Sequence, residues 1–142
     1  MKVNGREINL KMTSTNHSKK QKISTDKIAH TSRSWSQGIK FGDLLFLSGQ
    51  LGRNPITGEL EEGFGPQVRR VLSNLREIVE AAGSSMDMVL KTTIFVTDMS
   101  KLKELNAIYA EFFSDPLPAR SCVEVTALAG GAEVEIELIA GL

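Results

Sequence analysis

Residues 65–83 read GPQVRRVLSNLREIVEAAG, and this stretch decides the fold class. Its apolar residues recur at intervals of three and four, the period of a helix with one buried face. They are Val68, Val71, Leu72, Leu75, Ile78, Val79 and Ala82. Pro66 suits the first helical position, and Gly83 suits a left-handed cap at the end. The apolar face must lie on something flat and apolar, and a sheet is the simplest such surface.

Strand-like segments lie on both sides of this helix. They are residues 36–41, 44–51, 89–96, 120–125 and 133–139. The segment 44–51 is apolar enough to be buried on both faces, and Gly49 within it indicates a bulge or the close approach of another group. A second helix is predicted to begin at a cap formed by Ser100. The order β-β-α-β-α-β-β predicts an α+β domain with both helices on one face of the sheet.

The N-terminal residues differ from the rest. Residues 1–33 hold eight Lys or Arg and two Asp or Glu, whereas residues 34–142 hold nine and fifteen. The pair Asn4-Gly5 favours a short hairpin at 2–9, and residues 11–33 are polar enough to predict an irregular arm. The sequence therefore predicts a basic extension over 1–33 and one compact domain over 34–142.

Composition narrows the class of protein. A chain of 142 residues is most simply one domain, and it has no apolar run near the ~20 residues that span a bilayer. Its single cysteine, Cys122, cannot form an internal disulfide, which favours a reducing compartment and a cytoplasmic location. The acidic domain is a poor surface for the phosphate backbone of a nucleic acid.

Arg120 is the first candidate functional residue. It stands at the start of a strand in PARSCVEV, residues 118–125, where a lone guanidinium is unusual. Arginine grips a carboxylate with two parallel hydrogen bonds, although an ordinary ion pair at a strand end is the alternative. Glu135 follows in the last strand as a candidate general base, sharing one face with Glu133 and Glu137. That face is expected to meet either solvent or a second subunit.

Several other kinds of site lack their motifs. The sequence shows no metal-ligand spacing and no glycine-rich phosphate loop. The two histidines, His17 and His30, fall in the N-terminal extension, which leaves the domain without a Ser-His-Asp triad. Cys122 has no candidate base beside it and is expected to be a structural thiol. No metal or cofactor is therefore predicted.

Six motifs in order resemble one known family. They are Ser48-Gly49-Gln50; Asn54-Pro55 with Thr57-Gly58-Glu59; Lys91-Thr92-Thr93 with Phe95-Val96-Thr97-Asp98; Asn106, Tyr109, Phe112 and Phe113; the segment 118–125; and Glu135-Ile136-Glu137. Together they are similar to the YjgF/RidA family of reactive-intermediate (enamine or imine) deaminases, over about residues 34–140.

The resemblance implies a chorismate-mutase-like α+β fold and a homotrimer with active sites at the subunit clefts. It implies hydrolysis of 2-imino acids, such as 2-iminopropanoate and 2-iminobutanoate, to 2-keto acids and ammonia without a cofactor. Such imines arise from pyridoxal-phosphate enzymes that dehydrate serine and threonine. The partners expected are a small 2-imino or keto acid and other copies of the chain, with no membrane. The acidic domain disfavours a nucleic acid as a partner.

The resemblance also assigns roles to residues. Arg120 holds the substrate carboxylate, and Glu135 orients and deprotonates a water. The positions associated with the pocket are Trp35, Ser48, Gly49, Asn106 and Cys122. Many family members carry a tyrosine where this chain has Trp35, which keeps an aromatic wall but loses the phenolic hydroxyl.

Two other functions stay open at this point. An endoribonuclease or translation inhibitor is one, because that activity is also attributed to relatives, but it needs a basic groove and a group that protonates RNA. A non-catalytic trimeric protein that binds small carboxylates is the other, because Arg120 would hold a keto acid equally well without turnover.

Overall fold

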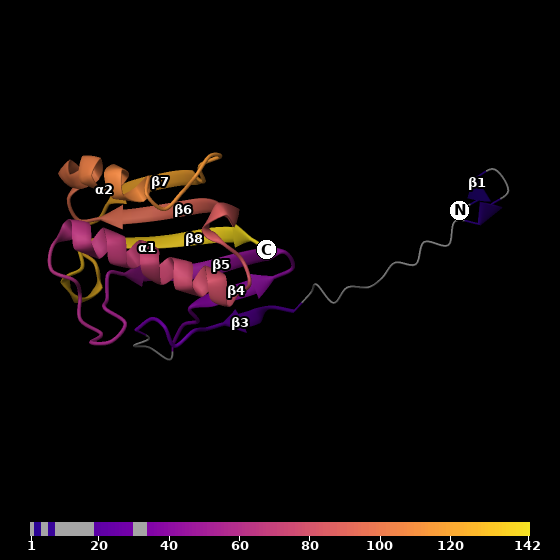
Figure 1. Ribbon diagram of the computed structural model, residues 1–142, viewed down its shortest axis with the longest axis horizontal. Helices are drawn as coiled ribbons and strands as arrows, with labels where there is room; N and C mark the ends of the chain where they lie inside the picture. Colours follow the sequence, from indigo (N-terminus) through magenta and orange to yellow (C-terminus); the bar gives the residue numbers. More distant parts are fainter. Residues whose placement is uncertain (1, 4–5, 8–18, 30–33) are drawn as a thin grey trace.

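The computed structural model describes residues 2–3, 6–7, 19–29 and 34–142. Its main feature is a six-stranded sheet of order β3-β4-β5-β8-β6-β7, with two helices on one face (Figure 1). The strands are β3 (Gln21–Ile23), β4 (Gly38–Phe41), β5 (Leu44–Leu51), β6 (Val89–Val96), β7 (Ala119–Glu124) and β8 (Val134–Gly141). The helices are α1 (Phe64–Ala81) and α2 (Leu102–Tyr109), with short 3-10 turns η1 (Met86–Met88), η2 (Met99–Lys101) and η3 (Ala129–Gly131). This arrangement confirms the predicted α+β class.

Helix α1 forms the core with the sheet as its sequence predicts. Its apolar face is fully buried, from Val68 to Val79, against β5 and β8 side chains such as Leu45 and Ile136. Gly83 follows the helix with a φ of 82°, which confirms the left-handed cap. The helix therefore covers the middle of the sheet and leaves the opposite face open.

The start of the second helical segment differs from the prediction. The Asp98 side chain, and not that of Ser100, caps the turn, because its Oδ1 accepts from the Ser100 backbone N–H at 2.9 Å. The same oxygen accepts from the Ser100 hydroxyl at 2.6 Å. Ser100 lies inside η2, where its N–H is one of the groups that needs a cap. The prediction of Ser100 as the cap was therefore wrong by two positions.

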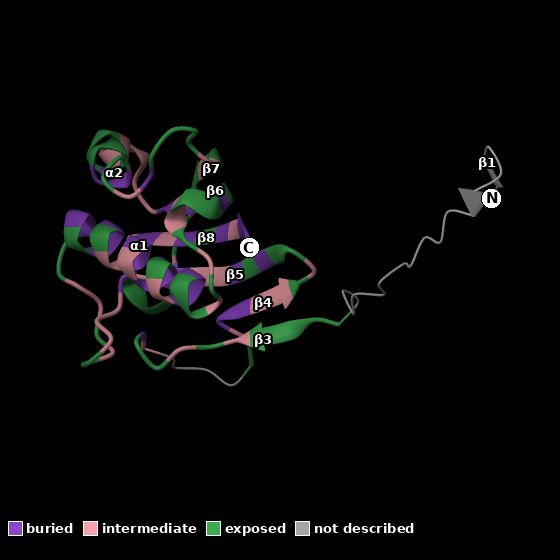
Figure 2. Ribbon diagram, turned by 45° about the vertical axis from the view of Figure 1, so that its right-hand side comes forward, coloured by how far each residue is buried: buried purple, intermediate pink, exposed green. Residues whose placement is uncertain are grey.

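Strand β5 is buried on one face only. Leu45 and Leu47 are buried under the helices, whereas Leu44 is 39% and Phe46 42% exposed on the other face (Figure 2). Side chains alternate along a strand, so an apolar run supplies residues to both faces. Within one chain, only the helix-covered face has something to bury it. The prediction that both faces are buried was wrong for the single chain.

The sheet begins earlier in the chain than predicted. Strand β3 pairs with β4, with Ile23 opposite Gly38, although the sequence predicts an irregular arm over 11–33. The buried Gln37 side chain fastens the following segment, since its Oε1 accepts from the Thr25 N–H at 2.7 Å and its Nε2 donates to the Thr25 carbonyl at 2.9 Å. The arm prediction was therefore wrong for this segment.

A small separate sheet occupies the region of the predicted hairpin. Strands β1 (Lys2–Val3) and β2 (Arg6–Glu7) pair antiparallel. The Asn4-Gly5 pair itself, and the histidines His17 and His30, lie outside the described residues.

Two kinds of feature are absent from the residues that the structure describes. None of the helices they contain is long and apolar enough to cross a membrane. No three His, Cys, Asp or Glu side chains among these residues come together as a metal-ligand group.

Candidate active site

The candidate site is built around a bulge in β5. Pairing of β5 with β8 shifts register between Leu47 and Gln50, which leaves Ser48 and Gly49 out of the regular ladder. A Cβ added to Gly49 would lie 2.0 Å from Oε1 of Glu135. The Glu135 carboxylate therefore rests directly on the Gly49 backbone, which confirms that this glycine permits a close approach.

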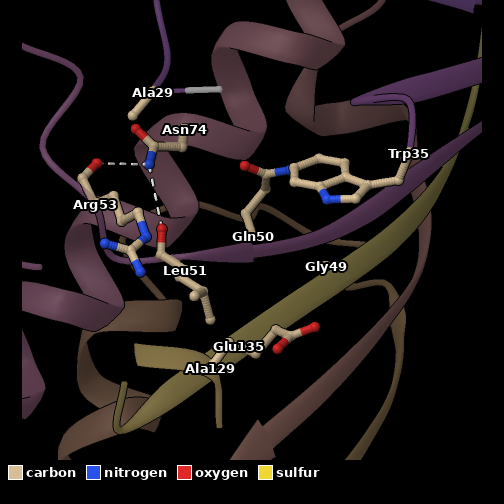
Figure 3. Close-up of a pocket in the computed structure, with 9 residues that line it drawn as sticks. All are labelled: Ala29, Trp35, Gly49, Gln50, Leu51, Arg53, Asn74, Ala129 and Glu135. Carbon is tan, nitrogen blue, oxygen red and sulfur yellow. Dashed lines mark hydrogen bonds between the residues drawn. The ribbon is translucent and has the colours of Figure 1, made fainter. Parts of the chain in front are cut away.

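Beside the bulge is a cavity of about 250 Å³. Figure 3 shows the residues around it, which come from several segments of the chain. They are Ala29, Trp35, Gly49, Gln50, Leu51, Arg53, Asn74, Ala129 and Glu135. Three of the residues expected at the site, Trp35, Gly49 and Glu135, thus line one cavity.

Glu135 supplies the carboxyl group among the residues that line this cavity. Burial raises the pKa of its carboxyl, and repulsion from Glu137 raises that pKa further. No described cation forms an ion pair with Glu135. Glu133 behaves differently from these two carboxylates, since it precedes β8 and pairs with Lys101. The three carboxylates therefore differ in their surroundings: Glu133 is paired with a lysine, whereas Glu135 lines the cavity.

Ser48 lies beside this cavity but does not line it. Its hydroxyl donates to the Ser36 carbonyl at 2.6 Å, and its backbone N–H donates to the Gln37 carbonyl at 3.1 Å. Both bonds hold the bulge against the segment that carries Trp35. In the structure Ser48 therefore shapes the cavity through the backbone.

Arg120 lies elsewhere, on the edge strand β7. Its guanidinium carbon is 5.0 Å from the ring centroid of Tyr109 in α2, a cation–π contact. The Tyr109 hydroxyl forms a buried hydrogen bond of 2.8 Å with Thr92, so the ring beneath Arg120 is fixed. No described carboxylate pairs with Arg120, and the residue is exposed. It is a positioned cation that faces solvent.

Asn106 and Cys122 belong with Arg120 and not with the cavity. Asn106 is exposed on α2, one turn before Tyr109. Cys122 follows Arg120 on the same side of β7 and packs partly against the core. Burial raises the pKa of its thiol, although the nearby Arg120 opposes this. The thiol is therefore kept protonated at neutral pH, as expected of a structural cysteine.

Sheet register places the two groups on opposite faces. Glu135 stands opposite Phe95, and Phe95 stands opposite Val123. Arg120 stands opposite Thr92 in the same ladders. Directly paired residues share a face, and neighbours along a strand alternate. Val123 and Arg120 are three positions apart, so Arg120 and Glu135 project from opposite faces of one chain.

Asn74 and Arg53 are among the cavity residues that were not foreseen from the sequence. Asn74 is buried in α1 and donates from Nδ2 to the carbonyls of Leu51 at 3.3 Å and Arg53 at 3.0 Å. Asn74 could have been noticed in the sequence because it is a polar residue next to the apolar positions of α1. Arg53, in the loop after β5, carried no local pattern that separates it from an ordinary surface arginine.

These features define an α+β domain that carries a glycine bulge and a half-buried glutamate at one cavity, and an exposed arginine on the other face of the sheet. The family model described as Endoribonuclease L-PSP matches residues 25–142. The chain belongs to this family, and the resemblance to YjgF/RidA proteins is confirmed. The match begins before the predicted boundary at residue 34.

Named relatives and a solved structure agree with this family membership. The chain is 44% identical over 125 residues to the chloroplastic Reactive Intermediate Deaminase A of Arabidopsis thaliana, covering 87% of this chain and 67% of that protein. It is 40% identical over 121 residues to the 2-iminobutanoate/2-iminopropanoate deaminase of Escherichia coli K12, covering 83% and 94%. The crystal structure of RidA from the Antarctic bacterium Psychrobacter sp. PAMC 21119 superposes with a TM-score of 0.84 at 43% identity, covering 86% and 99%.

Proposed function

We propose that this chain is a hydrolase that converts reactive 2-imino acids, such as 2-iminopropanoate and 2-iminobutanoate, to 2-keto acids and ammonia. The observation that carries the proposal is the Glu135 carboxylate, which lies on the Gly49 backbone in a cavity and has a raised pKa. A carboxyl group of this kind, held in a cavity with a raised pKa, is suited to general acid–base work. Relatives at 40–44% identity carry names for this activity.

Glu135 takes both proton-transfer roles in this proposal. It removes a proton from a water as the water oxygen attacks the imine carbon, and it returns the proton to the nitrogen. Glu135 then carries the hydroxyl proton of the tetrahedral adduct to the nitrogen as the C–N bond breaks, so that ammonia leaves and a carbonyl remains. An imine is already electrophilic, so proton transfer and positioning account for the catalysis.

Arg120 holds the substrate carboxylate in this proposal, from a second copy of the chain. Arg120 and Glu135 project from opposite faces of one sheet, so a site that uses both needs two chains. The open face carries Phe46, 42% exposed, and Val123, 44% exposed, which a second copy would bury. We therefore propose the homotrimer with sites between subunits that the resemblance implies.

The test is a coupled assay in which an amino-acid-consuming enzyme generates 2-iminopropanoate and its loss is followed with purified protein. We expect Glu135→Gln to lower kcat by about 100-fold or more, the usual value of a general base. Arg120→Ala should raise KM strongly, and Arg120→Lys should recover only part of the loss because lysine lacks the planar fork. A wild-type protein that gives no acceleration over buffer, yet binds pyruvate with and without Glu135, would instead be a carboxylate-binding protein.

The family description favours one further candidate, RNA cleavage. Residues 34–142 hold nine Lys or Arg against fifteen Asp or Glu, and an acidic surface repels a phosphate backbone. Incubation with a labelled single-stranded RNA tests this candidate, and cleavage that Glu135→Gln abolishes would support it.

With its single cysteine reduced, the protein is proposed to act in the cytoplasm.

A further inference from the structure

The cavity that holds Glu135 also holds a fixed cation, Arg53. Nη1 of Arg53 donates to the Gly58 carbonyl at 2.9 Å. Its own backbone carbonyl accepts from Asn74 at 3.0 Å. On another side, a Cβ added to Gly130 would lie 2.6 Å from Nη2 of Arg53, so the guanidinium packs tightly against η3. Helix α1, the loop after β5 and η3 together fix this side chain.

The charge of Arg53 is not neutralised within the described residues. The ion pairs found there join other residues and leave Arg53 out. A guanidinium has five N–H donors, and the Gly58 carbonyl takes one of them. A half-buried arginine with unused donors is a ready site for a carboxylate, which it binds through two parallel hydrogen bonds.

Arg53 and Glu135 stand at different ends of the cavity. Figure 3 shows Leu51 between them, with Asn74 and Ala29 near the Arg53 end. A substrate whose imine carbon is at Glu135 and whose side chain extends past Leu51 points that side chain toward Arg53. The length of that side chain, and any charge at its tip, decides whether it reaches the guanidinium.

We propose that Arg53 is a specificity-determining residue that selects 2-imino acids whose side chain ends in a carboxylate, the imines of acidic amino acids. The proposal rests on the proposed function for the orientation of the substrate. It assigns the two carboxylates of such a substrate to two arginines, the α-carboxylate to Arg120 of a second copy and the distal one to Arg53. The hydrolysis itself is unchanged.

The alternative role for Arg53 is a structural clasp between the 54–60 loop and η3. The hydrogen bond to Gly58 and the packing on Gly130 belong to both roles. The two roles predict different effects when the charge of Arg53 is removed. Loss of a structural clasp should weaken the binding of every substrate equally, whereas loss of a carboxylate site should weaken the binding of acidic substrates only. Arg53→Gln keeps an N–H donor for the Gly58 carbonyl but removes the charge, and Arg53→Lys keeps the charge.

The decisive experiment measures binding of stable keto acids, so that it is independent of turnover. Calorimetric titrations compare 2-oxoglutarate with 2-oxopentanoate, which has the same chain length and lacks the distal carboxylate. We expect the wild-type protein to bind 2-oxoglutarate at least about tenfold more tightly, since a charge-assisted pair contributes that much or more. Arg53→Gln should lose this preference, and Arg53→Lys should keep most of it.

Arg69→Met is the matched control, since Arg69 is an exposed arginine of α1 that pairs with Glu111 outside the cavity. It should leave both affinities unchanged within about twofold. Equal binding of the two keto acids by the wild type, or a preference that survives Arg53→Gln, overturns the proposal.

Turnover separates this proposal from the proposed function. Arg53→Gln should lower kcat/KM for 2-iminoglutarate by about 10- to 100-fold, mainly through KM, and change that for 2-iminopropanoate by less than about twofold. A protein that turns over neither imine but keeps the Arg53-dependent preference for 2-oxoglutarate contradicts the proposed function alone. Equal losses of kcat/KM for both imines in Arg53→Gln would show that Arg53 is a structural clasp.

Discussion

The Glu135 carboxylate occupies the space that a side chain at position 49 would need, so the two residues depend on each other. The added Cβ in Gly49→Ala would lie 2.0 Å from the carboxylate oxygen, so the carboxylate must move. The displaced atom is the end of a flexible side chain, and the fold should therefore stay intact, with a stability change under about 1 kcal/mol. We expect kcat to fall about 100-fold, as for loss of the base.

Imine hydrolysis and thermal unfolding of Gly49→Ala check this together. Gly38→Ala in β4 is the control, because its added Cβ would meet its nearest neighbour at an ordinary 3.4 Å. A fully active Gly49→Ala protein would show that the observed position of Glu135 is irrelevant to the chemistry.

The raised pKa of Glu135 predicts how activity depends on pH. A general base works as the carboxylate, so the rate falls as pH drops through the pKa of Glu135. Burial and then Glu137 raise this pKa, which places the acid limb of kcat/KM above that of an ordinary glutamate. Glu137→Gln removes the second cause and should move the limb to lower pH.

The control for this pH profile is Glu80→Gln, on the exposed side of α1. It should leave the acid limb in place. The same pKa predicts a sign for stability: a carboxyl with a raised folded-state pKa loses stabilisation as pH rises through that pKa. Glu135→Gln should therefore raise the unfolding midpoint at neutral pH, and the gain should vanish in acid. An unchanged or lower midpoint at neutral pH would contradict the direction of the shift.

At the scale of elements, one buried hydrogen bond joins α2 to the sheet. Thr92 in β6 and Tyr109 in α2 are both buried, and their hydroxyls are 2.8 Å apart. Thr92→Val leaves the Tyr109 hydroxyl without this partner, which should lower the free energy of unfolding by about 1–3 kcal/mol. Denaturant unfolding measures the loss.

The double variant Thr92→Val/Tyr109→Phe tests the cause of that loss. It removes both hydroxyls and should recover part of the stability, because no buried polar group is left unpaired. Strictly additive losses would show that packing, and not the hydrogen bond, sets the effect. The aromatic ring stays under Arg120 in both proteins, so the contact at 5.0 Å should persist.

The sequence predicted the apolar elements well and the polar ones poorly. Strands β5 and β6 have the bounds that their apolar and β-branched runs indicate. Strand β3 was missed because Gln21–Ile23 carries a single apolar residue, and its place in the sheet depends on pairing with β4 and on the buried Gln37. Tertiary contacts of this kind leave no periodic signal in the segment itself.

At the scale of the whole molecule, the two halves of the candidate site lie on opposite faces of one sheet. The motifs predicted which residues to consider, but numbering along the chain does not tell whether Arg120 and Glu135 meet. Strand pairing decides that, and it separates them within a single chain. The proposed mechanism then depends on assembly as much as on side chains.

A mixing experiment tests this dependence on assembly. Arg120→Ala and Glu135→Gln should each have strongly reduced activity alone. When the two are unfolded together at equal concentration and refolded, about a quarter of the interfaces in a closed ring should pair an intact Arg120 with an intact Glu135 and regain activity. The double variant carrying both changes in one chain, refolded with wild type, is the control for subunit exchange. No recovery in a mixture that demonstrably exchanges subunits would place the whole site within one chain.

The bulge at Gly49 also has an evolutionary consequence. The absent side chain at position 49 and the long carboxylate at position 135 occupy the same space. A side chain at position 49 can therefore be tolerated only after the side chain at position 135 has become shorter. Among descendants of such a chain, a substitution to a shorter residue at position 135 should precede any substitution of the glycine at position 49. A glycine retained at position 49 should mark the proteins in which the glutamate at position 135 still has a function.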